Sequence, residues 1–183
     1  MHTKFVLSVL GQDRPGIVAL VTRILADYKC NIEDLTQSIL QCEFAAIIIF
    51  SAPSDFNLPE LEKDLQAKLA AWNLSAGIKK KLSRESDPAP AQPFVVTTIG
   101  GDQIGQIGRL TSVLKNFACN ITKINAINRS ELYPEKVVMI FEIDVPLDAD
   151  IHALKKALGR VTDEMQIDFS VQHRDIFENI HRI

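Results

Sequence analysis

The spacing of apolar and polar residues divides the first half of the chain into six short elements. Runs rich in β-branched and aromatic residues predict strands, and apolar residues three and four positions apart predict amphipathic helices. The predicted strands cover 4–10, 31–41, 44–52 and 74–82, and the predicted helices cover 17–28 and 58–72. The apolar run within 44–52 is typical of a strand in the middle of a sheet. Asp13 is the expected N-cap of the first helix, with Pro15 in its first turn.

The second half repeats this order of elements. Strands are predicted at 94–99, 120–129, 136–145 and 167–171, and helices at 107–117 and 151–161. The tail, 175–183, has room for one more short helix. Each half therefore follows the strand–helix–strand–strand–helix–strand order of the split βαβ motif.

A direct repeat underlies this symmetry. Shifting the sequence by 89 residues aligns Phe5–Ile32 with Phe94–Ile121 without a gap, and 10 of the 28 aligned positions are identical. The triplet Cys-Asn-Ile at the end of the first segment returns unchanged at the end of the second. We infer that one module was duplicated within the chain.

Residues 84–93 separate the two copies. They include three prolines and no large apolar residue, which is typical of an extended linker. We therefore expect a first domain at 1–83, a linker at 84–93, a second domain at 94–174 and a C-terminal tail at 175–183.

The predicted fold class is α+β, with two ferredoxin-like βαββαβ domains. Right-handed crossovers would place both helices of a domain on one face of a four-stranded antiparallel sheet. The other face is then uncovered, although the first and third strands carry apolar residues on both faces. We therefore expect the modules to associate, either within the chain or in a homodimer.

The segment 11–16, Gly-Gln-Asp-Arg-Pro-Gly, connects the first strand to the first helix. Glycines permit a tight turn and close backbone approach, and a helix start offers free N–H groups to a carboxylate. Asn31 opens the next strand and is expected nearby, where its amide could bind the ammonium of the same ligand. These residues are compatible with an α-amino acid, although Gly11, Gly16 and Asp13 would equally serve a turn and a helix cap.

Charge and cysteine content restrict the function further. The net charge is −3, and residues 1–83 carry nine basic and nine acidic side chains against eleven and fourteen in residues 84–183, so neither half has the basic surface of a nucleic-acid binder. The three cysteines do not form a disulfide framework, and no leader or bilayer-length apolar run is recognised, so we expect a cytoplasmic protein. The four histidines are scattered, and we expect neither a metal site nor a cofactor.

Two sequence blocks carry a family resemblance. Asp13–Val18 (DRPGIV) and Cys30–Asp34 (CNIED) resemble the opening of an ACT domain, with its D-x-P-G turn and the asparagine that starts the second strand. Two such modules without a catalytic domain resemble the glycine cleavage system transcriptional repressor family over nearly the whole chain. The resemblance implies a non-enzymatic regulator that binds a small amino acid, with glycine suspected, between modules. It also implies repression through contact with a transcriptional activator, without direct contact with nucleic acid or membrane.

The resemblance places the ligand residues in the loop after the first strand and at the start of the second strand. They are Gly11, Asp13, Arg14, Gly16 and Asn31 in the first module, and Gly100, Asp102, Gly105 and Asn120 in the second. The second module has Gln103 and Ile104 where the first has Arg14 and Pro15. It is therefore either a second ligand site or a structural partner only.

Three other functions fit parts of the pattern. An ACT-type regulatory subunit of a metabolic enzyme would differ only in its partner. An acylphosphatase-like hydrolase would use Arg14 to hold phosphate and Asn31 to orient water, but Pro15-Gly16 is not the glycine-rich cradle of such enzymes and the second copy lacks the arginine. An RNA-binding sheet needs exposed aromatic residues on its central strands, where residues 45–49 are aliphatic.

Overall fold

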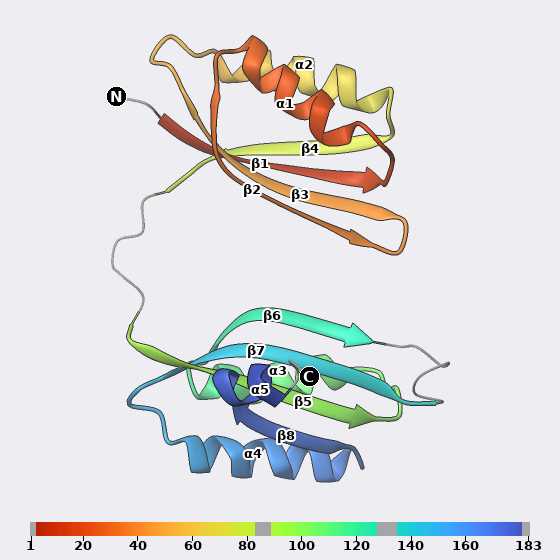
Figure 1. The fold of residues 1–183 in the computed structure, drawn as a ribbon, viewed down its shortest axis with the longest axis vertical. Helices are drawn as coiled ribbons and strands as arrows, with labels where there is room; N and C mark the ends of the chain where they lie inside the picture. The colour runs from red at the N-terminus through yellow and green to blue at the C-terminus, as the bar shows by residue number, and fades with distance from the viewer. Residues whose placement is uncertain (1–2, 83–88, 128–134, 181–183) are drawn as a thin grey trace. The chain divides into compact units, whose positions relative to one another are not determined.

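The computed structural model describes residues 3–82, 89–127 and 135–180. The chain divides into two compact units between Glu85 and Ser86, and each unit contains the β-α-β-β-α-β order (Figure 1). We call them the first and the second module. The predicted α+β fold with two ferredoxin-like domains is confirmed.

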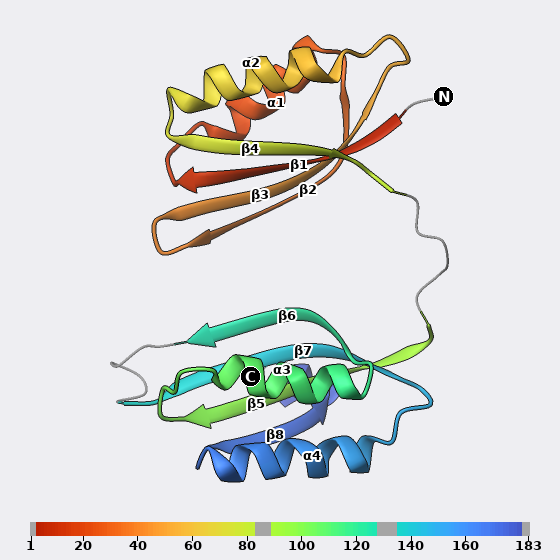
Figure 2. The same cartoon turned by 180° about the vertical axis from the view of Figure 1, so that it is seen from behind.

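The first module is one antiparallel sheet with two helices on one face (Figure 2). Its elements are β1 (Thr3–Gln12), α1 (Ile17–Asp27), β2 (Asn31–Leu40), β3 (Glu43–Ala52), α2 (Leu58–Ala70) and β4 (Leu74–Lys80). The strand order is β2-β3-β1-β4, so β3 is an inner strand, as its apolar run predicts.

The core of the first module lies between the sheet and the two helices. Alternate residues of β1 and β3 point toward the helices, and Phe5 stacks on Phe50 with ring centroids 5.4 Å apart. Helix α1 adds a buried stripe of Ile17, Val21, Ile24 and Leu25. Full burial of each such side chain contributes about 1.5–3 kcal/mol, which makes this face the main source of stability.

The start of α1 differs from the sequence prediction. Gly16, with φ 98° in the left-handed region, occupies the N-cap position, and no described side chain caps the helix. The N–H of Asp13 instead donates to the carbonyl of Cys42 at 2.8 Å. Asp13 therefore continues the line of β1 toward the β2–β3 turn, and Pro15 lies in the turn before the helix.

The second module has the same topology. Its elements are β5 (Ala91–Gly100), α3 (Gln106–Asn116), β6 (Asn120–Ile127), β7 (Val137–Pro146), α4 (Ile151–Glu164), β8 (Asp168–His173) and α5 (Arg174–Ile180), with strand order β6-β7-β5-β8. The second strand of each module carries a register shift at the same place, between Ile32 and Asp34 in β2 and between Ile121 and Lys123 in β6. The repeat therefore extends to an irregularity of the sheet.

Two boundaries differ from those expected. The linker predicted at 84–93 is too long at its C-terminal end, because β5 begins at Ala91 and pairs Pro93 with Asp144. Residue 83 of the expected first domain, residues 84–88 of the expected linker, and residues 128–134 between β6 and β7 lie outside the described residues. The tail forms helix α5, which starts at Arg174 directly after β8.

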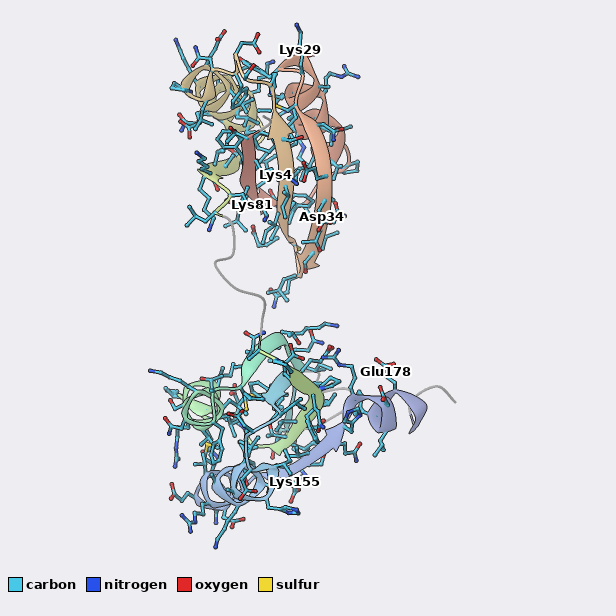
Figure 3. All side chains as sticks on the ribbon, turned by 90° about the vertical axis from the view of Figure 1, so that its left-hand side faces the viewer. Lys4, Lys29, Asp34, Lys81, Lys155 and Glu178 are labelled. Carbon is cyan, nitrogen blue, oxygen red and sulfur yellow. The ribbon has the colours of Figure 1, made fainter. Side chains whose placement is uncertain are left out.

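The two modules differ on the sheet face that the crossover helices leave open. Figure 3 shows α5 on the side of the second sheet opposite α3 and α4. Arg174, at its start, forms ion pairs with Glu142 (4.0 Å) and Asp144 (3.7 Å) of β7. Residues 3–82 of the first module contain no such helix, and Ile47 on its open face is 52% exposed.

In the described part of the chain, no helix combines the length and apolar character needed to cross a bilayer.

Separate cores predict separable unfolding transitions. Trp72 is the single tryptophan and belongs to the first module, so its fluorescence reports that module. Ile48→Val removes a methyl group from the first core and should lower the tryptophan-detected stability in urea by about 0.5–1.5 kcal/mol. The same change at Ile143, buried in the second core, should leave that transition at its wild-type midpoint. A shift of the tryptophan transition by both variants would contradict separate cores.

Candidate functional site

The glycine turn and Asn31 lie at opposite ends of the first sheet. Gly11 pairs with Phe44, whereas Asn31 pairs with Ser51, seven residues further along β3. At about 3.3 Å per residue, the separation along the strand is about 23 Å. The expectation that Asn31 neighbours the turn is therefore wrong within one module. The second module repeats the separation, because Gly100 pairs with Val137 and Asn120 with Asp144.

A hollow of about 390 Å³ lies at the head of α1. Its walls come from the turn, the first residues of α1, the middle of β2 and the start of β3. The lining residues are Asp13, Arg14, Pro15, Gly16, Ile17, Val18, Ala19, Gln37 and Phe44. The structure thus brings three of the predicted ligand residues, Asp13, Arg14 and Gly16, to one hollow.

The backbone at the head of α1 offers unpaired donors. The first hydrogen bond of the helix runs from the N–H of Leu20 to the carbonyl of Gly16, at 2.9 Å. The N–H groups of Ile17, Val18 and Ala19 precede it, so the helix itself supplies no acceptor for them. They sit at the positive end of the helix dipole, so this end of the hollow favours a carboxylate.

Gln37 is a residue of the hollow that the sequence interpretation missed. It pairs with Ala46, which is buried beneath the helices, so Gln37 lies on the helix-facing side of β2. Its amide can donate to a carboxylate and accept from an ammonium group. The sequence did contain one indication, because Gln37 is a polar residue midway between Leu35 and Ile39 on the same face of the strand. The register shift after Ile32 interrupts the alternation of apolar and polar residues and hides this indication.

Arg14 is held by an aromatic ring at the rim of the hollow. Its guanidinium carbon lies 4.0 Å from the ring centroid of Trp72, a cation–π contact of about 0.5–1 kcal/mol at an exposed site. Within one module Arg14 and Asn31 are at opposite ends of the sheet, so they cannot act together on one phosphate group there. The acylphosphatase-like alternative thereby loses its pair of residues.

Packing explains two of the candidate glycines. A Cβ atom added to Gly11 would lie 2.5 Å from the carbonyl oxygen of Asn73, and one added to Gly100 would overlap the side chain of Ile167. Each glycine therefore lets the last strand of its own module approach the first strand closely. Gly105, with φ 82°, has open space around such an atom, so it is the candidate glycine most accessible to a ligand.

The turn of the second module is built differently. Gln103, which replaces Arg14, donates from Nε2 to the carbonyl of Met165 at 2.6 Å. Ala126 occupies the position of Gln37, and Asp102 is exposed. Gln106, the first residue of α3, is buried, and its side-chain amide has no hydrogen-bond partner among the described residues. The second module therefore does not reproduce the polar groups of the first hollow.

Asn31 and Asn120 are exposed at the starts of their strands, each next to a cysteine. Burial raises the pKa of the Cys30 thiol and of the Cys119 thiol, so both remain protonated near neutral pH. Their Sγ atoms lie 3.7 Å and 3.8 Å from the carbonyls of Tyr28 and Phe117. These contacts support a packing role for both thiols.

Metal and RNA sites receive no support from the described residues. Within 3–82, 89–127 and 135–180, no three histidine, cysteine or acidic side chains gather where they could hold a metal ion. In the first module Phe5, Phe44 and Phe50 all face the helices, so the open face of β1 and β3 presents no aromatic residue for base stacking.

The packing role of Gly100 is testable by substitution. Gly100→Ala places a methyl group against Ile167 and should lower the free energy of unfolding of the second module by about 1–3 kcal/mol. Gly101→Ala is the matched control, because nothing lies within 4 Å of the added atom. Urea unfolding followed by circular dichroism compares the two, and equal stabilities would show that Gly100 is not required for packing.

Comparison with known proteins places the first module in a known family. Residues 3–82 match the family model of the ACT domain. A UPF0237 protein of Methanosarcina mazei is 34% identical over 84 residues, which are 45% of this chain and 87% of that protein. The glycine cleavage system transcriptional repressor of Escherichia coli (strain K12) is 27% identical over 170 residues, which are 91% of this chain and 87% of that protein.

Solved structures share the fold over nearly the whole chain. A protein of unknown function from Galdieria sulphuraria has a TM-score of 0.76 at 21% identity, covering 94% of this chain and 99% of that one. A protein provisionally assigned as a glycine cleavage system transcriptional repressor has a TM-score of 0.70 at 19% identity, covering 94% and 97%. At these identities the likeness shows the two-module fold.

Proposed function

Because this chain belongs to the ACT domain family, we propose that it is a non-enzymatic regulator whose first module binds a small amino acid at the head of α1. The observation that carries the proposal is the hollow of about 390 Å³ in which unpaired helix N–H groups and the amide of Gln37 share one space. A zwitterion needs both a seat for a carboxylate and an acceptor for an ammonium group, and the hollow offers both.

The helix N–H groups on one side of the hollow and the amide of Gln37 on the other orient the ligand. Its carboxylate accepts from the N–H groups of Ile17, Val18 and Ala19, and its ammonium donates to Gln37 and to Asp13 at the rim. Phe44 supplies an apolar wall. Glycine is the first ligand to test, because the E. coli relative is named for the glycine cleavage system.

Asn31 enters this site only from another module. It is about 23 Å from the turn of its own module by the strand rise, so one amino acid cannot touch both. Strand β2 is an edge strand with most of its side chains exposed. Antiparallel pairing of two such edges through a two-fold axis brings the start of one strand to the end of the other. The proposed complete site is therefore shared by the first modules of two chains.

The second module is proposed as the weaker site. Gly105 keeps an open helix head there, but Gly100 is committed to packing and Ala126 replaces the amide of Gln37. Asp102 and Asn120 stay predicted ligand residues of that module.

The regulated process is proposed from the same relative. A protein 27% identical over 91% of this chain is named as a transcriptional repressor, which supports repression of glycine cleavage genes. The near-neutral charge of each half favours contact with an activator protein over contact with DNA. A cytoplasmic location and the absence of a cofactor remain part of the proposal. The ligand acts on the partner only through its different affinities for the free and the bound regulator.

Amino-acid binding is tested by isothermal titration of the full chain with glycine, serine and alanine. Gln37→Ala removes a hydrogen bond to a charged group and should weaken binding about tenfold or more. Gln66→Ala, the same change at an exposed position of α2, should bind as wild type. Asn31→Ala should weaken binding only in samples that sedimentation shows to be associated. If no amino acid binds wild type at millimolar concentration, the sensing role is wrong.

Regulation through protein contact is tested with a purified transcriptional activator of the glycine cleavage genes. Its affinity for the full chain should change about 5–150-fold when the amino acid identified by titration is added, the usual range of allosteric coupling. The Gln37→Ala variant should lose this response while keeping its contact with the activator. Binding of an amino acid without any contact with the activator would favour the alternative of a regulatory subunit for a metabolic enzyme.

A further inference from the structure

The open sheet face of the first module carries an uncovered apolar hollow. Its volume is about 390 Å³, and it is lined by Val6, Ser8, Ile47, Gly77, Ile78 and Lys79. It exists because Gly77 pairs with Ser8 and has no side chain to fill the space between β4 and β1. Ile47 beside it is 52% exposed, and Leu10 on the same face is 54% exposed.

The second module shows what covers this face in the same fold. Val95 is the counterpart of Val6, since Val6 pairs with Ile49 and Val95 with Glu142 at the same place in the two sheets. Val6 is half-buried, whereas Val95 is 1% exposed, on the face where α5 packs against β5 and β8. A short amphipathic helix is therefore an occupant that this face of the fold accommodates.

The two faces differ in charge where the helix begins. In the second module, Glu142 and Asp144 receive Arg174, the first residue of α5. The first module has Ile49 and Ser51 at these two positions.

Lysines surround the same region of the first module. Lys79 pairs with Val6, and the N–H of Lys81 donates to the carbonyl of Lys4 at 2.8 Å. Figure 3 labels Lys4 and Lys81 close together on the first module. Glu33 pairs with Lys4 at 2.6 Å, and their hydrogen bond lowers the pKa of this carboxyl, so it stays charged near neutral pH. Lys81 also lies near Glu33, since its charge further lowers the pKa of this carboxyl. Among the described residues neither Lys79 nor Lys81 forms an ion pair, so both can interact with an acidic partner.

We infer that the open face of the first module binds a short amphipathic helix of a partner protein, with apolar residues over the Gly77 hollow and acidic residues toward Lys79 and Lys81. Acidic residues in the first turn also suit the positive end of a helix dipole. This docking surface does not depend on the amino-acid site, because the two hollows share no lining residue. Its test needs no amino acid, so either inference can fail without the other.

The test uses a probe derived from α5. A peptide with the sequence of residues 174–183, in which Arg174→Glu and Arg182→Glu supply the acidic ends, is titrated into the full ¹⁵N-labelled chain and followed by NMR. Saturable shifts are expected in β1, β3 and β4, around Val6 and Gly77. The unaltered peptide, with its arginines, should bind more weakly.

Two matched variants isolate the apolar contact. Ile47→Asp should weaken the acidic peptide about tenfold or more, because it places a charge where an apolar side chain is buried on binding. Ile39→Asp is the control, since Ile39 is also 52% exposed but lies on the helix-facing side of β2. Both positions are exposed, so both variants should fold, and ¹⁵N spectra without peptide verify this.

A charge exchange isolates the electrostatic contact. The double variant Lys79→Glu with Lys81→Glu should reverse the preference and bind the unaltered peptide better than the acidic one. Absence of shifts, shifts confined to the second module, or equal binding by Ile47→Asp and Ile39→Asp would each overturn the inference. Concentration-dependent dimerisation that Ile47→Asp abolishes would assign the face to a second copy. Tighter binding of a single-stranded oligonucleotide at the same residues would assign it to nucleic acid.

Discussion

The path of the chain through α1 determines where polar chemistry can occur in the first module. Strand β2 pairs antiparallel with β3, so the chain must return to the end where β1 began before β2 can start. The head of α1 therefore lies at the opposite end of the sheet, where β1 ends. Three of its N–H groups precede the first helical hydrogen bond. The module is otherwise held by an apolar core, and at this helix start a hollow lies beside the glycine turn. The position of the proposed ligand site, and the need for a second copy of the chain to bring Asn31 to it, both follow from this path.

Local periodicity was sufficient to predict the elements, because each strand and helix buries one face. Phe5, Leu7 and Val9 alternate on β1, and Val21, Ile24 and Leu25 form a helical stripe on α1. The apolar positions in the sequence are therefore the buried positions in the structure. The repeat then fixed the fold class, since the two halves must share it. The family resemblance likewise rested on local blocks and agrees with the match of residues 3–82 to the ACT domain.

Features that depend on contacts distant in sequence were not predictable in this way. Asp13 is a good capping residue, but its N–H is used by the carbonyl of Cys42, which only the register of β1 against β3 brings near. Gln37 was missed because one register shift moves it to the helix-facing side of β2. Pro93 suggested a linker, yet at that point β5 has a neighbour only on the β7 side, where a proline is tolerated as on an edge strand. In each case, pairing with a strand distant in sequence overrode the structure that the local sequence pattern predicted.

Duplication also explains how one fold can carry two different surfaces. In the second module α5 covers the open face, and Arg174 forms ion pairs with the acidic residues of β7. The apolar and charged groups of that face therefore have partners within the chain. In the first module the corresponding face keeps a hollow and lysines, while the head of α1 keeps its own hollow. Strand β1 belongs to both, since it leads into the glycine turn at one end and carries Val6 and Ser8 on the open face. A ligand that orders the turn can influence a partner on the open face only if β1 or its neighbours differ between the free and the bound forms. Strand β3 also connects the two surfaces, because Phe44 lines the hollow at the head of α1 and Ile47 lines the hollow on the open face. Strands β1 and β3 are thus the direct structural links between the two surfaces.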